Sequence, residues 1–465
     1  MNIYIHIEVK AREFESRMLL ALAAAERGHS VVLGSREETV DLAAAGLLTP
    51  GIVHDKCVTP YSKKLGRMEA MRARGHLITS QDEEHGLLYD SYDDFARMRY
   101  SATSIGMADR VFLWGQFDHE VIARTYPDHA DRFVACGSPR VDLWRQDVRP
   151  VLSPALKAAC DAGPLVLVPS NFVLALNAGR IWDFIKLQND LYRKQRADAA
   201  GVLAGSAQFG ETSLFRRTAL QFELIRHFVR MIRSLSRSFP QASIVVRPHP
   251  AEDARAWPAL LGRGLANVTV SADGALINWI KKARVVVHNS CTSGLEAAVA
   301  GVPRIAYRPV RSKYEASVPN SVSYPAGSLP DLTAAVGRLL SGQALELPAE
   351  NRAAADRVLA SRFANLEGSL AADRIVREWE ALDRPDLRRP NDWRAVHAAL
   401  ARDDRALPPP DSAAPARVDL PSHKFPDLTE AEISAFATHL RDSMDRFHTV
   451  RWKRLGQRSF GFFKS

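Results

Sequence analysis

The chain has 465 residues, of which 46% are hydrophobic and 25% charged, as in an ordinary soluble globular protein. It is long enough for two domains with buried cores, and no apolar run reaches the roughly 18 residues that a membrane-spanning helix needs. The net charge of +9 permits anionic partners such as nucleotide sugars, phospholipid headgroups or nucleic acid, without choosing among them.

The sequence shows no sign of export. Its four cysteines are scattered without the spacing of metal ligands, which indicates a reducing compartment. The segment Asn2–Ile7 is typical of a strand, and no basic stretch precedes a long apolar one as in a signal peptide. We therefore expect a cytoplasmic protein.

Strands and helices alternate from the start of the chain. A strand at Asn2–Val9, an amphipathic helix at Arg12–Arg27 and a strand at His29–Leu33 form a βαβ unit, the usual opening of a Rossmann-like domain. Lys10 and Glu13 lie at the junction of the first strand and its helix. Charged residues at this position face the cleft in such folds, although a solvated loop is an equal alternative.

Three adjacent acids, Asp82, Glu83 and Glu84, follow an apolar strand at His76–Thr79. Because crowded like charges repel, this run is unfavourable for stability. A site that stabilises a cationic transition state, or that exchanges a proton with an acceptor hydroxyl, would explain it. The alternative is a solvated acidic loop.

A turn at Gly137–Asp142 carries Arg140 and Asp142, and we expect both to hold the crossing between two domains, with the boundary near Val151. In the second half, Asn171 comes just after a strand at Pro164–Val168. A long basic helix follows at residues 218–238. Its predicted buried stripe comprises Phe222, Ile225, Phe228, Val229 and Ile232, and its arginines are expected to form a solvated face.

Two strand-to-helix junctions organise the second half. Ser243–Val246 runs into Arg247-Pro-His249-Pro, and Arg284–Val287 runs into a segment rich in serine and threonine. In a parallel sheet such junctions gather at the carboxyl edge, where helix N-termini bind phosphate. The prolines hold His249 extended at a strand end, which suits an imidazole directed at a phosphate.

The second junction offers small and hydroxylated residues at Ser290, Thr292, Ser293 and Gly294. A backbone of this kind can approach an anion closely, while its hydroxyls add donors. Glu296, in the first turn of the following helix, can accept hydrogen bonds from ribose hydroxyls. The alternative is that the serines cap a helix and that Glu296 complements its dipole.

The C-terminal part changes composition. Residues 386–426 are rich in proline, charge and small side chains and are predicted to form a linker. Residues 427–465 are predicted to form a last helix, Glu430–Phe447, and a basic tail that contains Trp452 and three phenylalanines. Such a tail suits a membrane interface, and docking on the protein itself is an equal alternative.

These features resemble a bacterial surface-carbohydrate biosynthesis family, close to capsule and lipopolysaccharide glycosyltransferases that use CMP-activated Kdo. The likeness lies in Val9–Glu13, Gln81–Gly86, Gly137–Asp142 and the pair of junctions, over about the first two thirds of the chain. The junctions also resemble those of bacterial sialyltransferases and glycerol-phosphate polymerases.

The resemblance implies an α/β, GT-B-like fold with two Rossmann-like domains facing a cleft. The predicted domains are residues 1–150 for the acceptor and 151–385 for the nucleotide sugar. It further implies a metal-independent glycosyltransferase without cofactor, which moves Kdo or a related ulosonic acid from a CMP donor to a glycan or lipid-linked glycan. The inner-membrane surface is a further expected partner and nucleic acid is not.

Carried onto this sequence, the resemblance gives each candidate a role. Glu83 is the preferred catalytic acid among Asp82, Glu83 and Glu84. The predicted donor-binding residues are Arg247, His249, Ser290, Thr292, Ser293, Gly294, Glu296 and Asn171, and the cleft candidates are Lys10 and Glu13. Two alternatives stay open: a UDP-sugar 2-epimerase-like enzyme, which shares the fold and a similar Ser-Gly turn before a glutamate, and a non-catalytic scaffold of polysaccharide assembly.

Overall fold

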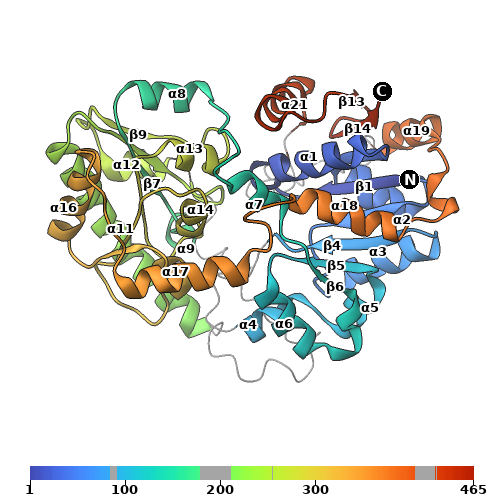
Figure 1. Cartoon of the computed structure of the whole chain (residues 1–465), viewed down its shortest axis with the longest axis horizontal. Helices are drawn as coiled ribbons and strands as arrows, with labels where there is room; N and C mark the ends of the chain where they lie inside the picture. The colour runs from blue at the N-terminus through green and yellow to red at the C-terminus, as the bar shows by residue number, and fades with distance from the viewer. Residues whose placement is uncertain (84–91, 178–210, 254, 404–424, 426) are drawn as a thin grey trace, which may run out of the picture. The chain divides into compact units, whose positions relative to one another are not determined.

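A computed structural model describes residues 1–83, 92–177, 211–253, 255–403, 425 and 427–465, and divides the chain into two compact units (Figure 1). Unit 1 comprises Met1–His85, Ala96–Leu143 and Ser361–Ser465, and unit 2 comprises Gly86–Phe95 and Trp144–Ala360. The chain therefore returns to unit 1 at Ser361, whereas the sequence analysis continued the second domain to residue 385.

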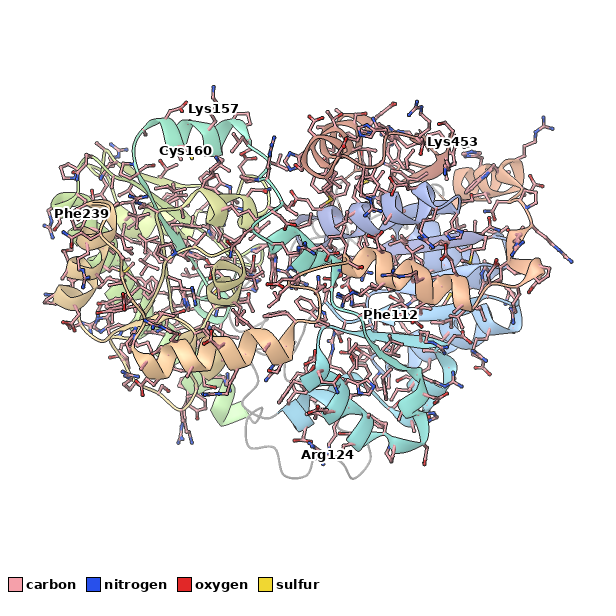
Figure 2. All side chains as sticks on the ribbon, viewed as in Figure 1. Phe112, Arg124, Lys157, Cys160, Phe239 and Lys453 are labelled. Atoms are coloured by element: carbon pink, nitrogen blue, oxygen red, sulfur yellow. The ribbon has the colours of Figure 1, made fainter. Side chains whose placement is uncertain are left out.

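Unit 1 is built on an eight-stranded sheet with the order β13-β14-β2-β1-β3-β4-β5-β6. Strands β1 to β6 are parallel, and β14 is antiparallel to β2. Its strands are β1 (Asn2–Ile7), β2 (Ser30–Ser35), β3 (Ile52–Asp55), β4 (Leu77–Gln81), β5 (Arg110–Leu113), β6 (Phe133–Ala135), β13 (Val450–Arg454) and β14 (Ser459–Lys464). Near-continuous apolar runs suit strands covered on both faces, and Phe112 on β5 lies fully buried among them (Figure 2).

Unit 2 is built on a six-stranded sheet with the order β12-β11-β10-β7-β8-β9, in which every pair is parallel. Its strands are β7 (Leu165–Pro169), β8 (Ser243–Arg247), β9 (Val268–Val270), β10 (Val285–His288), β11 (Arg304–Tyr307) and β12 (Tyr324–Ala326). Two Rossmann-like parallel sheets confirm the predicted GT-B-like α/β class.

Helices follow most of the strands. They are α1 (Lys10–Glu26), η1 (Glu37–Asp41), α2 (Leu42–Ala45), α3 (Ser62–Ala73), α4 (Tyr92–Arg99), α5 (Ala102–Met107), α6 (Gln116–Thr125), η2 (Pro127–Arg132), α7 (Pro139–Trp144), α8 (Pro154–Asp161), α9 (Val173–Leu176), α11 (Glu211–Ser238), α12 (Ala256–Leu261), α13 (Leu276–Lys282), α14 (Ser293–Val299), α15 (Ser317–Ser321), α16 (Leu329–Leu340), α17 (Ala349–Arg362), α18 (Ala371–Ala381), η4 (Pro385–Arg388), α19 (Trp393–Asp403) and α21 (Glu430–Met444). In the part of the chain that is described, no helix is both long and apolar enough to cross a bilayer. The predicted linker contains η4 and α19, and its proline run Leu407–Pro410 lies outside the described residues.

The helix α11 corrects one sequence-based prediction. Ile225, Phe228 and Ile232 are buried in the core of unit 2 as expected, but Phe222 is 52% exposed. The buried stripe instead continues through Leu224 and Met231, because the helix turns its 224/228/231/235 ridge toward the sheet.

The turn at Gly137–Asp142 acts within unit 1. Asp142 is fully buried and accepts hydrogen bonds from the backbone N–H groups of Ala371 and Ala372, at 2.9 and 3.0 Å, so it caps α18. It also accepts one from Asn365 Nδ2 at 2.6 Å. Gly137 has φ +86°, and a Cβ there would lie 2.2 Å from Asn365 Oδ1. Asp142 therefore fixes the returning chain to unit 1, a contact that the sequence analysis had assigned to a crossing between domains.

The basic tail forms the antiparallel hairpin of β13 and β14 at the β2 edge of the sheet. Phe460 and Phe462 are 0% and 1% exposed, so they belong to the core of unit 1. The exposed side chains include Lys453, which is marked on β13 in Figure 2. The structure thus shows docking on the protein, and two aromatic side chains of the predicted membrane segment are buried.

Candidate functional site

The topology of unit 2 indicates where a ligand binds. Strands β8 and β9 lie on one side of β7, and β10, β11 and β12 lie on the other, so the strand order reverses between β7 and β10. In open α/β sheets the loops that follow strands at such a point diverge and leave a crevice for ligands. Asn171 follows β7 and Ser290 follows β10. The amide Nδ2 of Asn171 donates to the backbone oxygen of Ser290 at 2.9 Å, which brings these two predicted residues together.

The Ser290 loop is held in an uncommon conformation. Ser290 has φ +51°, a region that costs energy for residues with a Cβ. Asn320 stabilises it from both sides: its Oδ1 accepts the Ser290 N–H at 2.9 Å, and its Nδ2 donates to Ser290 Oγ at 3.1 Å. Strain that is held in this way is typical of functional loops. Asn320 was not among the predicted site residues, because it lies thirty residues away on α15.

The close packing around residue 294 leaves room only for glycine. A Cβ at this position would lie 2.5 Å from Nε2 of His288, whose ring is fully buried and contacts Ser323 Oγ through Nε2 at 2.8 Å. Ser323 Oγ donates to Pro319 O, so His288 Nε2 carries the proton. Gly294 therefore allows the start of α14 to approach β10 closely, a packing role in addition to the predicted backbone role.

The other predicted residues of this loop differ in exposure. Thr292 is half-buried, whereas Ser293 and Glu296 are 0% and 2% exposed. Ser293 is the first residue of α14 and Glu296 lies in its first turn. The half-exposed groups of the loop, Ser290 and Thr292, are thus the ones open to a ligand.

The first junction is mostly occupied by protein contacts. Arg247 donates from Nη1 to the backbone oxygen of Asp273 at 2.6 Å and from Nη2 to that of Gly274 at 2.7 Å, and its guanidinium lies over the Trp279 ring. Burial lowers the pKa of Arg247 to about 10. His249 is half-buried, and its Nδ1 accepts the Ala251 N–H at 3.1 Å, which leaves Nε2 to carry the proton.

The loops after β7 and β8 are joined by a buried glutamate that the sequence analysis missed. Glu252 Oε1 accepts from Ser170 Oγ at 2.8 Å and from the Phe172 N–H at 2.7 Å. Trp257 Nε1 donates to Oε2 at 3.2 Å. Burial raises the pKa of Glu252. Glu252 comes just after the His-Pro segment, but nothing in the sequence distinguishes it from an acidic residue on the surface.

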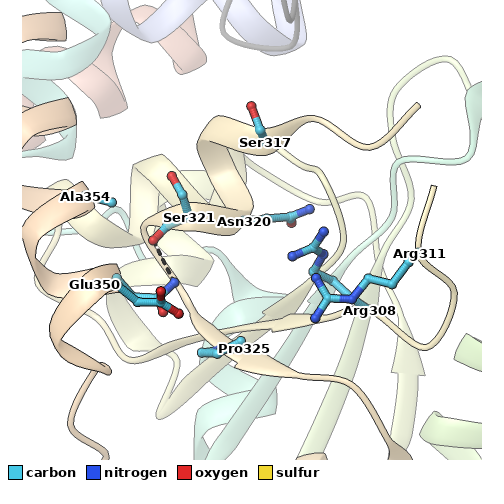
Figure 3. Close-up of a pocket in the computed structure, with 9 residues that line it drawn as sticks. Arg308, Arg311, Ser317, Asn320, Ser321, Pro325, Glu350 and Ala354 are labelled. Carbon is cyan, nitrogen blue, oxygen red and sulfur yellow. Dashed lines mark hydrogen bonds between the residues drawn. The ribbon is translucent and has the colours of Figure 1, made fainter. Parts of the chain in front are cut away.

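A pocket of about 470 Å³ adjoins the Ser290 loop (Figure 3). Asn320 lines this pocket and holds Ser290, so the two features share a residue. Two arginines, Arg308 and Arg311, lie side by side in its wall. Arg308 Nε donates to Glu315 Oε1 at 2.9 Å, and Arg311 is exposed. The remaining lining residues are Ser317, Ser321, Pro325, Glu350, Asn351 and Ala354. Arg308 directly follows β11, just as the predicted junction residues follow β8 and β10. The same sequence rule could therefore have identified Arg308 as a candidate.

In unit 1, the preferred acid Glu83 is buried just beyond the carboxyl end of β4. Its Oε1 lies 3.0 Å from Nη2 of Arg17, which is 1% exposed. Burial raises the pKa of the Glu83 carboxyl, against the opposing charge of Arg17 and with the help of the nearby Glu13. Glu13 is fully buried, and its Oε2 accepts the Glu8 N–H at 2.7 Å. Glu13, Glu83 and Arg17 thus form a buried cluster of two carboxylates and one guanidinium group.

This cluster contains polar atoms that the described residues leave unsatisfied. Within these residues, Glu13 Oε1, Glu83 Oε2 and two guanidinium nitrogens of Arg17 are buried without a hydrogen-bond partner. Buried polar atoms are nearly always paired, so such a group is typical of a site that binds a polar ligand. The sequence analysis missed Arg17, although it lies four residues after Glu13 on α1 and therefore on the same helix face.

The other residues predicted in unit 1 have different surroundings. Asp82 accepts two hydrogen bonds from Arg99, at 2.7 and 2.8 Å, as in a structural ion pair. Lys10 contacts Glu432 Oε1 at 2.6 Å and so holds α21. Glu84 lies outside the described residues. Glu83 and Glu13 are therefore the predicted acidic residues that share a cluster.

Neither a protein-family model nor a curated protein matches the chain. Solved structures match its fold. UDP-GlcNAc 2-epimerase from Neisseria meningitidis, bound to UDP-GlcNAc, is 12% identical with a TM-score of 0.42, over 82% of this chain and 100% of that chain. UDP-GlcNAc 2-epimerase from Methanocaldococcus jannaschii, in complex with UDP-GlcNAc and UDP, is 12% identical with a TM-score of 0.41 over the same shares. The S. aureus protein MnaA, bound to UDP, is 13% identical with a TM-score of 0.46, over 84% and 99%.

These findings correct the predicted function. The similar structures named here are UDP-GlcNAc 2-epimerases and a UDP-bound protein, so the prediction of a CMP-Kdo-type glycosyltransferase is wrong and its stated alternative fits better. The physical reason is that the prediction rested on junction residues whose types suit phosphate and ribose, which every nucleotide shares. They carry no information on the base, on the sugar or on an acceptor.

The buried His288 makes a testable prediction about stability. Burial, with a smaller effect of Arg304, lowers the pKa of His288 from 6.5 to about 3. The unfolded chain then binds a proton that the folded chain does not, so stability falls as the pH drops below 6.5, by about 1.4 kcal/mol per pH unit down to about pH 3. Urea unfolding at pH 7.5 and pH 5 should show that His288→Gln loses about 2 kcal/mol less than the unaltered protein. Equal losses would contradict the buried neutral imidazole.

Proposed function

We propose that this protein is a nucleotide-sugar enzyme of the UDP-sugar 2-epimerase type. Unit 2 binds the nucleotide at the Ser290 loop and the adjoining pocket, and Glu83 of unit 1 serves as an acid–base group. Epimerisation inverts the configuration at carbon 2 of the sugar, so it needs no acceptor. The motifs that resemble surface-carbohydrate enzymes support a role in supplying a sugar for cell-surface carbohydrate.

The observation that carries the nucleotide site is the contact between Asn171 and Ser290 at the reversal of strand order, beside a pocket with two arginines. The loop offers hydroxyls and backbone to one phosphate. Arg308 and Arg311 add guanidinium groups, which suit phosphate oxygens, and Arg308 is also paired with Glu315. The exposed Arg311 beside a hydroxyl-rich loop suits the second phosphate of UDP, which CMP lacks.

The raised pKa of Glu83 supports a reaction in which a proton is removed and returned. A carboxylate nucleophile, as in a retaining transferase, must stay ionised, whereas a group that removes and returns a proton works best with a pKa near the working pH. Because burial raises the pKa of Glu83, its surroundings favour the second role. Arg17, 3.0 Å away, is placed to stabilise the ionised form when the proton leaves.

The reaction can be followed without an acceptor. The purified protein is incubated with UDP-GlcNAc in D₂O, and proton NMR records the sugar H2 signal. Removal of the C2 proton with loss of UDP from C1 leaves a C1–C2 double bond, and return of a solvent proton to C2 and of UDP to C1 should place deuterium at C2 and produce the 2-epimer. If UDP binds but neither exchange nor epimer is seen, the chain is a non-catalytic nucleotide-sugar binder, which is the scaffold alternative.

Arg311→Ala should weaken UDP binding about tenfold, because it removes a charge-assisted contact to phosphate. Arg352→Ala is a matched control: it deletes the same kind of side chain from α17, next to the pocket residue Asn351, but Arg352 does not line the pocket. Calorimetric titration with UDP and CMP measures both variants, and UDP should bind the unaltered protein more tightly. An equal effect of both substitutions would place the diphosphate elsewhere.

A further inference from the structure

One face of α11 carries aromatic residues followed by arginines. Phe215 and Phe222 are 59% and 52% exposed, and Arg226, Arg230 and Arg237 are exposed beyond them. A helix repeats every 3.6 residues, so these positions form one stripe along a helix of 28 residues. The helix is marked α11 in Figure 1.

The exposed phenylalanines are not needed to hold the helix in place. The opposite face of α11 is anchored in the core of unit 2 through side chains that are at most 4% exposed, namely Leu224, Ile225, Phe228, Met231, Ile232 and Leu235. Large aromatic side chains on the outer face therefore cost hydrophobic free energy without adding to this core. Such residues, when they cluster, mark interaction surfaces.

The cluster extends onto the next helix. Arg233 Nη2 donates to the backbone oxygen of Leu261 at 3.1 Å, and the neighbouring Leu260 is 37% exposed. Three of the five large hydrophobic side chains that are exposed in the described chain thus lie on α11 and α12. We call the exposed set Phe215, Phe222, Leu260, Arg226, Arg230 and Arg237 the α11 face.

The α11 face is positively charged. Its exposed stripe from residue 215 to 237 contains a single acid, Glu223, against its arginines. A solvated helix face usually carries both positive and negative charges. A row of arginines next to phenylalanines therefore indicates a partner that has an anionic surface and an apolar layer beneath it. A second copy of this chain would bring the same positive charge and would be repelled when the stripes align.

We propose that the α11 face binds the surface of a membrane that contains anionic phospholipid. An amphipathic helix of this kind lies in the plane of the interface, where aromatic side chains enter the boundary between headgroups and acyl chains. The arginines bind headgroup phosphates, and the two phenylalanines anchor the N-terminal half. None of the residues of the α11 face is among those of the proposed nucleotide site, and the surface differs from the C-terminal tail.

Sedimentation with vesicles tests the proposal on the full-length protein. The protein should bind vesicles of phosphatidylcholine mixed with phosphatidylglycerol and should release at high salt. The pair Phe215→Ser and Phe222→Ser should lower the partition coefficient about tenfold or more. The pair Arg226→Glu and Arg230→Glu should remove the dependence on phosphatidylglycerol. Thermal unfolding checks that each variant is folded.

Two controls make the outcome decisive. Leu152→Ser removes a side chain that is equally exposed, and the pair Arg451→Glu and Lys453→Glu reverses two charges on the tail hairpin. Both should leave vesicle binding unchanged.

Loss of binding in the tail variant with retention in the α11 variants would overturn the proposal, as would equal binding to pure phosphatidylcholine. A change of oligomeric state in the phenylalanine variant without a change in vesicle binding would assign the face to a second copy, and preferential binding of an oligonucleotide would assign it to nucleic acid.

Discussion

Glu83→Gln is expected to lower the rate of C2 proton exchange in UDP-GlcNAc by roughly 10³-fold, the range typical for loss of a general acid–base group. Glutamine keeps the size of the side chain and can still contact Arg17, 3.0 Å away in the native protein, but it cannot take up a proton. The affinity for UDP should stay within about twofold, because in the proposal unit 2 holds the nucleotide. Proton NMR in D₂O and calorimetric titration measure the two quantities separately.

A matched substitution separates catalysis from stability. Glu26→Gln makes the same chemical change at the last residue of α1, where Glu26 Oε2 accepts a hydrogen bond from Arg446 Nη2 at 2.7 Å. It should reduce stability and leave exchange intact. If Glu83→Gln exchanges the proton at the normal rate while folded, Glu83 is not the acid–base group and Glu13, in the same cluster, becomes the candidate. The acidic limb of the native pH profile should lie above the ordinary pKa of a glutamate, because burial raises the pKa of Glu83.

Gly294→Ala is expected to destabilise unit 2 by about 1–3 kcal/mol and to weaken UDP binding more than tenfold. The added methyl group would lie 2.5 Å from His288 Nε2 and 3.1 Å from the Pro319 oxygen, so the start of α14 must move away from β10. This movement displaces Thr292 and the Ser290 loop, which the nucleotide contacts in the proposed function. Urea unfolding and calorimetric titration give the two effects.

The control for this substitution is Gly327→Ala, because a Cβ at Gly327 meets no atom within 4 Å. It should leave both quantities nearly unchanged. Combining Gly294→Ala with His288→Ser should recover part of the lost affinity, since the smaller side chain makes room for the methyl group. An unaltered affinity in the single variant would show that the approach of α14 to β10 does not shape the nucleotide site.

Much of the fold was predictable because it depends on local patterns. The apolar runs at Asn2–Ile7 and Ser243–Val246 have the composition of buried parallel strands, and the structure places β1 and β8 there. The junction residues were predictable for the same reason, since a parallel sheet places every strand-to-helix turn at one edge. Asn171 and Ser290 meet as this rule requires.

The remaining features depend on contacts between distant segments. Arg17 belongs to the Glu83 cluster and Asn320 holds Ser290, but in each case the partner lies far away in sequence. The orientation of α11 could not be read from periodicity, because Phe222 fits the apolar stripe as well as Leu224 does. Which nucleotide binds was not predictable from junction residues whose types suit only phosphate and ribose.

Asp142 caps α18, so it joins the part of unit 1 that precedes unit 2 in the sequence to the part that follows it. This arrangement affects the order in which the two units can fold. Unit 1 is assembled from segments on both sides of Trp144–Ala360, and its sheet gains β14 beside β2 only after unit 2 has been synthesised. Unit 2 is contained almost entirely in one continuous stretch, Trp144–Ala360. It can therefore fold on the ribosome before the C-terminal strands of unit 1 have been synthesised. A stop before β14 would therefore remove a strand that pairs with β2 in the sheet of unit 1, while unit 2 would keep all of its strands.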